Sequence, residues 1–425
     1  MIAANVPSTM RVIVPSRVTG EGGFDTFTCS VIEELTNLVE FVVWVLPDHV
    51  LGLGQSVTQS QRLMIESFEW PPTFWQHGFD SISGTLLIAL REHKSSELIQ
   101  LLRKIQLQLR LEHLIKKYKI THCLFTTSMG VPPPHLRVPM VAIVHDRNWR
   151  MFPENCTWLT PARLDSNTRD WVSTADSIIT PSRAVQREVT ELYPECRSKI
   201  DVVPEASTVS KHQNSQPEGG VKASDPTPIF YYPGAARAHK GHLTLFKAAL
   251  KLASAGHHFR VVLTGPNTKL LTGYWAAQTP QVEQCRSFYL QHIGVLQQHI
   301  EALDFCDRQQ VEQLYRFSRR VVLPSQYEGF GLPLIESVAR GCRVICSDIE
   351  PYREQIELYQ CAGFVEVYPV DDFQALAAHM EQALLAPDDQ RLSPVEAHSI
   401  AARWTWTDAT RAIVSILQES TMSRP

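Results

Sequence analysis

The sequence predicts two α/β domains in tandem, each a doubly wound parallel sheet covered by helices. Short, continuous runs of apolar and β-branched residues alternate with helical sequence in both halves of the chain, as in strands that are buried on both faces. This alternation stops once, in a stretch rich in Ser, Gly and Pro at 206–227. The 425 residues, 44% of them hydrophobic, suit about two to three domains. Since such sheets bind ligands at the carboxyl ends of their strands, we expect a binding cleft between the domains.

The first domain is expected to span 1–205 and to begin with a strand at 11–16. A glycine loop that contains Gly22 and Gly23 then leads into a helix with apolar residues at helical spacing. Further buried strands are expected at 41–47, 121–127, 139–146, 176–182 and 199–205. Residues 206–227 are interpreted as a flexible linker, because they contain few apolar residues.

The second domain is expected to span 228–390, where the alternation of strands and helices restarts. Strands are predicted at 229–232, 259–265, 320–324, 342–347 and 363–369. Helices are predicted at 242–256, within 280–298, at 307–318, from Pro333 onwards and at 371–385. Gly256 supplies a stop signal for the first of these helices.

Composition excludes several classes of protein. A formal net charge of -4 gives no global reason to expect nucleic acid as a partner. The nine cysteines show neither a C-x-x-C pair nor the Cys/His spacing of a zinc site, and we interpret them as reduced thiols of a cytoplasmic protein. The N-terminus lacks the pattern of a secretory signal, and the most apolar stretch, 38–46, is too short to span a membrane.

The stretch VVLPSQYEGFGLPLIESVA at 321–339 predicts a ligand site. A strand should end at Leu323, and Pro333 suits the first position of a helix, which places Glu336 in the first helical turn and Glu328 in the loop. Gly329 and Gly331 leave loop amides uncovered, so these amides and the helix N-terminus can hold an anionic or hydroxyl-rich ligand.

Two carboxylates beside such a turn do not suit a phosphate alone, because they repel it. A nucleotide sugar fits better, since carboxylates accept hydrogen bonds from hydroxyls while amides and cations hold the diphosphate. Glu336 by itself is better explained as an acidic residue that complements the helix dipole. The combination with Glu328 and the glycine turn is the more specific signal.

Cations and a histidine complete the candidate site. Lys240 follows a predicted strand and a glycine, and a cation there stabilises the charge that grows on a departing diphosphate. Arg237 either shares this task or belongs to a solvated basic loop. His145 lies at the carboxyl end of a buried strand. No Asp-x-Asp occurs in the chain, so we expect no metal and no cofactor.

These segments resemble the family 4 (group 1) glycosyltransferases of the GT-B fold over most of the chain. The resemblance implies that Glu328 contacts the donor sugar, that Glu336 binds the ribose and that Lys240 binds the diphosphate. It further implies that the amides of Gly329, Phe330, Gly331 and Leu332 face the sugar and diphosphate, that His145 faces the transferred sugar, and that Gly22 and Gly23 approach the acceptor and diphosphate. Arg237 lies three positions after Gly234, whereas many members have an arginine one position after the glycine, so its role stays open. Residues 391–425 resemble the closing segment that packs back on the first domain.

The expected activity is transfer of a sugar from a nucleoside-diphosphate sugar to a hydroxyl acceptor, which is a glycan, a polysaccharide intermediate or a lipid-linked saccharide. The resemblance implies retention of the anomeric configuration in a hexosyltransferase, with mannose and glucose as candidate sugars. A nucleotide-sugar epimerase of the same fold is one alternative. An inactive binding protein is another, although such a protein should lack one of Glu328, Glu336, Lys240 or His145, and all four are present.

The segment at 95–120 is basic and amphipathic. It reads either as a helix packed on the sheet or as a helix that docks on an anionic membrane, where a lipid-linked acceptor would lie. The second interpretation would place a cytoplasmic protein at the inner membrane surface.

Overall fold

The computed structural model describes residues 9–16, 23–47, 60–68, 94–156, 160–209, 227–273, 279–387 and 391–422. The chain forms two compact units. Unit 1 contains Met1–His145, Thr157–Glu205 and Trp406–Pro425, and unit 2 contains Asp146–Cys156 and Ala206–Thr405. The chain thus passes between the units after His145, Cys156, Glu205 and Thr405.

Unit 1 is built on a parallel sheet of seven strands in the order β3-β2-β1-β4-β5-β6-β7. Its strands are β1 (Arg11–Pro15), β2 (Phe41–Pro47), β3 (Leu63–Phe68), β4 (His122–Phe125), β5 (Met140–Ile143), β6 (Ser177–Thr180) and β7 (Ile200–Val202). The edge strand β3 is not expected from the sequence, because Glu66 and Ser67 interrupt its apolar run and it is only partly buried. The central strands β4 and β5 are fully buried, and β1 is buried after Arg11, as their apolar sequences predict.

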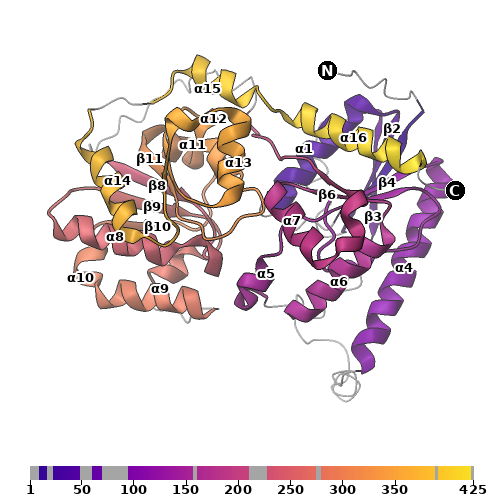
Figure 1. Cartoon of the computed structure of the whole chain (residues 1–425), viewed down its shortest axis with the longest axis horizontal. Helices are drawn as coiled ribbons and strands as arrows, with labels where there is room; N and C mark the ends of the chain where they lie inside the picture. Colours follow the sequence, from indigo (N-terminus) through magenta and orange to yellow (C-terminus); the bar gives the residue numbers. More distant parts are fainter. Residues whose placement is uncertain are drawn as a thin grey trace. The chain divides into compact units, whose positions relative to one another are not determined.

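The helices of unit 1 include α1 (Gly23–Leu38), α4 (Lys94–Tyr118), α6 (Pro161–Thr174), α7 (Arg183–Leu192) and α16 (Trp406–Met422). The C-terminal helix α16 packs against α1 near the start of the chain (Figure 1). Trp406 meets the ring of Phe27 edge to face at 5.5 Å, and the Thr407 hydroxyl donates a hydrogen bond to Glu34 at 2.8 Å. Unit 1 therefore contains both ends of the described chain.

Unit 2 is built on a parallel sheet of six strands in the order β10-β9-β8-β11-β12-β13. Its strands are β8 (Ile229–Pro233), β9 (Arg260–Thr264), β10 (Ile300–Ala302), β11 (Ser318–Leu323), β12 (Val344–Ser347) and β13 (Val365–Tyr368). The direction of the chain across the sheet reverses between β8 and β11, and such a switch point is where doubly wound sheets bind ligands. The edge strand β10 escapes prediction because it has only three residues.

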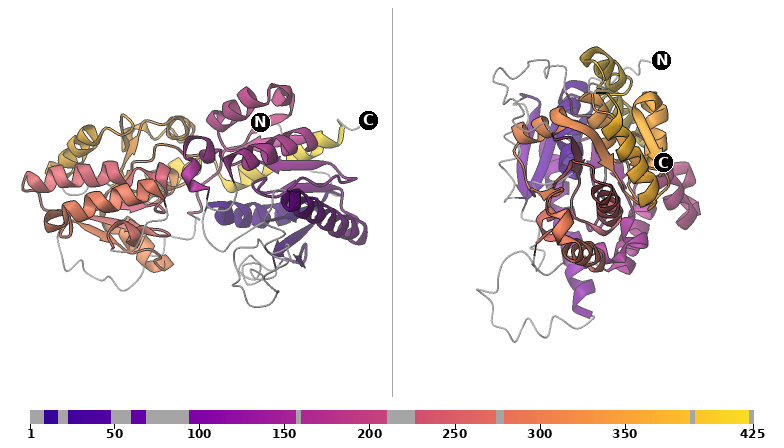
Figure 2. Two further views of the ribbon diagram at one scale, coloured as in Figure 1. Left: turned by 90° about the horizontal axis from the view of Figure 1, so that it is seen from below. Right: turned by 90° about the vertical axis from the view of Figure 1, so that its left-hand side faces the viewer.

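Helices lie on both faces of the sheet in unit 2 (Figure 2). The helices α8 (His242–Ser254), α9 (Pro280–Gln291), α10 (Ile293–Leu296) and α14 (Phe373–Leu385) form one layer. Separate from this layer, α12 (Pro333–Ala339) contacts α13 (Glu350–Tyr359) and α15 (Pro394–Ala401). A further helix, α11 (Arg308–Phe317), begins with a capping box between Asp307 and Gln310.

The units differ from the predicted domains at two places. The boundary after residue 205 coincides with the end of unit 1 in that part of the chain, and residues 210–226 of the predicted linker lie outside the described residues. Residues 391–405 belong to unit 2, because α15 packs on α12. The segment Asp146–Cys156, which includes the short helix α5 (Asn148–Met151), also belongs to unit 2.

Within the described ranges, no helix combines the length and the apolar composition that a membrane span requires. All nine cysteines carry free thiols, and six of them are buried: Cys123, Cys196, Cys285, Cys342, Cys346 and Cys361.

Candidate functional site

The glycine turn follows β11 directly, as predicted, since the strand ends at Leu323 and α12 begins at Pro333. Gly331 adopts φ +90°, and a Cβ added there would lie 2.5 Å from Cε1 of Tyr352. Only glycine fits this position without strain. The buried amide of Gln355 in α13 donates hydrogen bonds to the carbonyl oxygens of Phe330 (2.6 Å) and Gly331 (3.1 Å).

The backbone N–H groups of the same turn have a different environment. In the described part of the chain, no acceptor lies within hydrogen-bonding distance of the N–H groups of Phe330, Gly331 and Leu332. With the carbonyls held by Gln355 and the N–H groups left without an acceptor, the turn is suited to donate hydrogen bonds to an oxygen-rich ligand.

Lys240 and Glu328 are direct partners. The Lys240 ammonium donates hydrogen bonds to both Glu328 carboxylate oxygens, at 2.7 and 2.9 Å, and the Ser325 hydroxyl donates a third at 2.7 Å. The two charged side chains are 17% and 10% exposed. The hydroxyl of Tyr232 donates a hydrogen bond to the carbonyl oxygen of Lys240 at 2.7 Å.

A second glycine brings the two halves of this ion pair together. Gly241 adopts φ +65°, and an added Cβ would lie 1.8 Å from the carbonyl oxygen of Pro324. The loop after β8 therefore lies directly against the loop after β11. This contact explains why Lys240, at the end of the short turn Ala238–Lys240, reaches Glu328.

Two tyrosines border the Glu328 carboxylate. Burial, and next the negative charge of Glu328, raises the pKa of Tyr232 and of Tyr352 well above the usual value. Both hydroxyls consequently stay protonated, and that of Tyr352 lies 3.5 Å from a Glu328 oxygen. Tyr232, Tyr352 and Gln355 escape prediction, because a single tyrosine or glutamine carries no distinctive pattern.

Glu336 lies in the first turn of α12, as predicted. Its carboxylate accepts a hydrogen bond from the Thr208 hydroxyl at 2.9 Å, and its carbonyl oxygen accepts one from Arg340 at 3.0 Å. The Arg340 guanidinium is itself paired with Glu312 at 2.9 Å. Glu336 is therefore held by a neutral hydroxyl that a ligand hydroxyl can replace.

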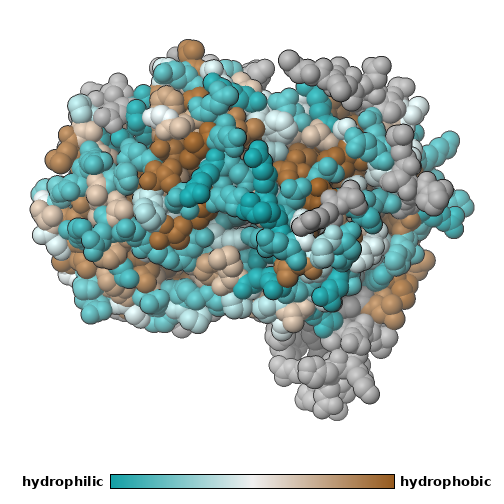
Figure 3. Space-filling view, in the orientation of Figure 1, coloured by the Kyte–Doolittle hydropathy of each residue, from teal (hydrophilic) through white to brown (hydrophobic). Residues whose placement is uncertain are grey.

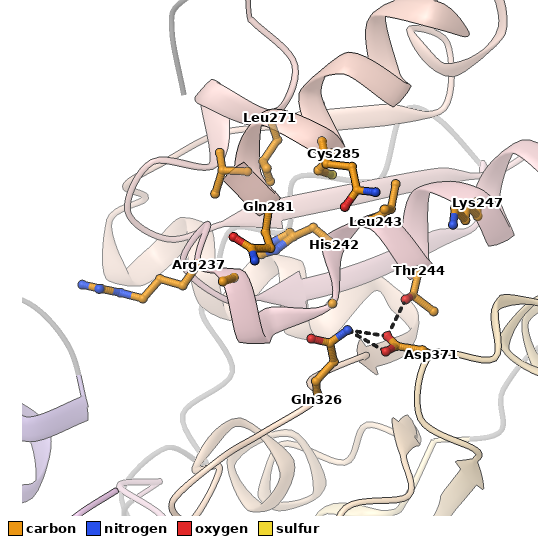
Figure 4. Close-up of a pocket in the computed structure, with 14 residues that line it drawn as sticks. Arg237, His242, Leu243, Thr244, Lys247, Leu271, Gln281, Cys285, Gln326 and Asp371 are labelled. Carbon is orange, nitrogen blue, oxygen red and sulfur yellow. Dashed lines mark hydrogen bonds between the residues drawn. The ribbon is translucent and has the colours of Figure 1, made fainter. Parts of the chain in front are cut away.

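Arg237 is exposed at the rim of a cavity of about 260 Å³ in unit 2. The cavity lies around the N-terminus of α8, and Gln326 and Thr244 point toward Asp371 at one side of it (Figure 4). Asp371 accepts hydrogen bonds from Gln326 at 2.6 and 2.7 Å and from Thr244 at 3.0 Å. Neither Glu328 nor Glu336 lines this cavity, so it is distinct from the glycine turn.

His145 lies in unit 1, two residues after β5, and is 8% exposed. Its Nδ1 is 3.0 Å from a carboxylate oxygen of Glu205, and its Nε2 is 2.7 Å from the carbonyl oxygen of Thr126. The ring also meets Phe27 edge to face at 4.8 Å. Both ring nitrogens thus face acceptors of the protein itself, and the contact of His145 with a sugar stays a prediction.

The predicted N-terminal glycine loop is only partly described. Gly22 lies outside the described residues, and Gly23 is the first residue of α1. Across the described residues, no group of three or more His, Cys, Asp and Glu side chains is arranged to hold a metal ion.

Part of the chain carries a sequence signature that is shared with known proteins. Residues 218–397 match the model of the family described as glycosyl transferases group 1. The chain is similar to the O-antigen chain mannosyltransferase B of Escherichia coli, with 28% identity over 122 residues, or 29% of this chain and 31% of that protein. It is similar to the D-inositol 3-phosphate glycosyltransferase of Corynebacterium urealyticum, with 24% identity over 58% of this chain and 57% of that protein. The chain thus spans about a third to three-fifths of the length of these curated relatives.

The similarity in fold to solved structures covers nearly all of the chain. The structure of Anabaena Alr3699/HepE in complex with UDP and glucose matches 98% of this chain and 100% of that one, with a TM-score of 0.62 and 16% identity. At this identity the likeness concerns the fold. The protein has the GT-B fold, and its residues 218–397 carry the sequence signature of group 1 glycosyltransferases.

Proposed function

We propose that this protein transfers a glycosyl group from a nucleoside-diphosphate sugar to a hydroxyl acceptor. The observation that carries the proposal is the pairing of Lys240 with Glu328 beside a glycine turn, at the switch point of the unit 2 sheet. The match of residues 218–397 to the group 1 family supports it. His145 and the N-terminal glycines, Gly22 and Gly23, belong to the proposal as groups that face the sugar and the acceptor.

Lys240 is proposed to stabilise the departing nucleoside diphosphate. An ammonium group has three N–H donors, and Glu328 accepts two of them in the structure. The third donor can contact a phosphate oxygen while the ion pair stays in place. A fixed cation in a partly buried position lowers the free energy of a transition state in which negative charge grows on the leaving group.

The two carboxylates and the turn are proposed to orient the donor. Glu328 accepts hydrogen bonds from hydroxyls of the transferred sugar, and Glu336 accepts them from the ribose in place of Thr208. The N–H groups of Phe330, Gly331 and Leu332, together with Gly329, donate to the sugar and the diphosphate. Arg237 is proposed to assist at the diphosphate.

Retention of the anomeric configuration and independence from metal are finer parts of the proposal. The family resemblance implies retention, and Lys240 supplies a cation next to the proposed diphosphate position. The similarity to a mannosyltransferase favours a hexose donor. NMR of the product anomer tests retention, and activity after treatment with a chelator tests independence from metal.

Contact with a membrane surface is also proposed, through one face of α4. Leu101, Ile105 and Leu109 are spaced by four residues and are 53%, 45% and 66% exposed. Apolar residues gather over this helix at the right of Figure 3. Such a face would bring the protein to a lipid-linked acceptor. Leu109→Glu should reduce sedimentation with vesicles that contain phosphatidylglycerol, whereas Val395→Glu, at an exposed position of unit 2, should not.

The first test is a thermal-shift screen with GDP-, UDP-, ADP- and dTDP-sugars, because a ligand that binds the native state raises the unfolding temperature. The stabilising donor is then incubated with and without a hydroxyl acceptor, and the products are analysed by NMR. Transfer requires an acceptor. Conversion of the donor sugar without an acceptor would instead indicate an epimerase, and stabilisation without any conversion would indicate a binding protein.

A further inference from the structure

The turn that carries Lys240 is contacted by a segment from much earlier in the chain, Asp146–Cys156, which belongs to the same unit. Asn155 lies near the end of this segment and is buried. Its Oδ1 accepts a hydrogen bond from the N–H of Ala238 at 3.1 Å, and its Nδ2 donates one to Nδ1 of His239 at 2.9 Å. One side-chain amide therefore binds both residues that precede Lys240.

This contact determines the protonation of His239. An amide nitrogen only donates, so Nδ1 must accept and the proton of the neutral ring lies on Nε2. His239 is 6% exposed, and Phe152 of the same segment packs beside its ring at 5.9 Å. Burial, followed by the positive charges of Lys240 and Arg237 and the nearby His242, lowers the pKa of His239 well below its usual value. The neutral ring that Asn155 requires is thus the stable form at neutral pH.

The same segment also contacts the other half of the ion pair. The N–H of Arg147 donates a hydrogen bond to the Tyr327 hydroxyl at 3.0 Å, and Tyr327 directly precedes Glu328. The N–H of Gln326 in turn donates to the carbonyl oxygen of His239 at 2.8 Å. Segment Asp146–Cys156 therefore forms hydrogen bonds with the residues immediately before Lys240 and immediately before Glu328.

We propose that Asn155 is a positioning residue, whose amide fixes the Ala238–Lys240 turn so that the Lys240 ammonium stays in line with Glu328 and the leaving diphosphate. This inference rests on the proposed function, because Asn155 affects the reaction only through the proposed role of Lys240. Asn155 itself contacts protein groups and needs no contact with the substrate.

The first test is a double-mutant cycle of Asn155→Asp with Lys240→Ala, measured as kcat/KM for the donor. Asn155→Asp alone should lower turnover roughly 10- to 100-fold, because a small displacement of a catalytic group from its reactive position lowers the rate by such factors. If Asn155 acts through Lys240, the aspartate should have little further effect in the Lys240→Ala background. Two independent losses that multiply in the double variant would overturn the proposal.

The second test uses the protonation of His239. In Asn155→Asp one carboxylate oxygen still accepts from Ala238, but the other faces the lone pair of Nδ1. The ring must then carry a proton on Nδ1, either by a change of tautomer or by binding a second proton. Adding His239→Asn places an amide donor at the position of Nδ1, which should restore the activity of Asn155→Asp. No rescue by His239→Asn would contradict the proposal.

Gln297→Glu makes the same chemical change at an exposed position of unit 2 and should leave the turnover of the wild type unchanged. A measurement without turnover separates this inference from the proposed function. In the ¹⁵N NMR spectrum of the wild type, His239 should show the Nε2–H tautomer, and Asn155→Asp should change it. If the wild type transfers no sugar but this tautomer and its change are seen, the proposed function fails while the contact of Asn155 with the turn stands. A His239 protonated on Nδ1 in the wild type would contradict that contact directly.

Discussion

The ammonium nitrogen of Lys240 lies 2.7 and 2.9 Å from the two carboxylate oxygens of Glu328, 88 positions further along the chain. Each residue belongs to a loop at the carboxyl end of a central strand, β8 or β11, and these strands are neighbours at the switch point of the sheet. The Gly241 contact with Pro324 holds the two loops together. The pair is therefore a consequence of the topology.

Lys240→Ala should lower kcat for sugar transfer by two or more orders of magnitude, because the leaving diphosphate loses its cation. The loss in turnover should exceed the loss in stability, although removing one partner of a largely buried ion pair also lowers the unfolding temperature. Circular dichroism melting and initial-rate kinetics check both points. Lys251→Ala, at an exposed position of α8, is the matched control and should behave as wild type. A Lys240→Ala variant of full activity would remove the diphosphate role.

Glu336→Ala should weaken donor binding about 10-fold or more, since a carboxylate that accepts hydrogen bonds from ribose hydroxyls is lost. Calorimetry with the preferred nucleoside diphosphate measures the change. Thr208→Val removes the hydroxyl that donates a hydrogen bond to the Glu336 carboxylate. The affinity of this variant for the nucleoside diphosphate should be equal to that of the wild type or slightly higher. Unchanged affinity in Glu336→Ala would be incompatible with the ribose assignment.

Gly331→Ala should destabilise unit 2 by about 1–3 kcal/mol, because the new Cβ would lie 2.5 Å from the Tyr352 ring at φ +90°. Gly363→Ala is the control, since no heavy atom lies within 4 Å of its added Cβ. Urea unfolding of the two variants gives the comparison. Equal stability of both would show that the turn tolerates a side chain.

Acid should destabilise the protein partly through His242. Burial lowers the pKa of this residue to about 3, so the folded state keeps it neutral while the unfolded chain binds a proton below pH 6.5. Its contribution to stability is therefore complete above the unfolded pKa and is lost as the pH falls from 6.5 toward 3, by up to about 1.4 kcal/mol per pH unit.

His242→Asn keeps an amide that can hydrogen-bond to the backbone of Gly234, as His242 does, but cannot titrate. Stability of this variant should fall less steeply between pH 6 and pH 4, as about one proton fewer is taken up on unfolding. His258→Asn, at an exposed position just beyond α8, serves as the control. Identical slopes for His242→Asn and the wild type would contradict the assignment.

The sequence predicts the architecture well because strands buried on both faces have an unmistakable apolar pattern. The end of β11 at Leu323 and the start of α12 at Pro333 follow from local rules for strands and helix termini. The edge strands β3 and β10 are missed, since one carries polar residues and the other is very short.

The candidate site is predicted only in part. A glycine turn with two glutamates is visible locally, whereas the partners of its side chains depend on contacts between distant segments. Thr208 lies 128 positions from Glu336, and Glu205 lies 60 positions from His145. No local pattern marks such residues, and Asn155 in particular reads as an ordinary turn residue until its partners are seen.

Acceptor-dependent release of nucleoside diphosphate tests the central claim most directly. With the stabilising donor sugar, the wild type and Lys251→Ala should release diphosphate when a hydroxyl acceptor is added, and Lys240→Ala should release it at least about 100-fold more slowly. Equal release by Lys240→Ala, or no release by the wild type with any donor that binds, would contradict the account of Lys240 and Glu328 as the centre of a glycosyl transfer site.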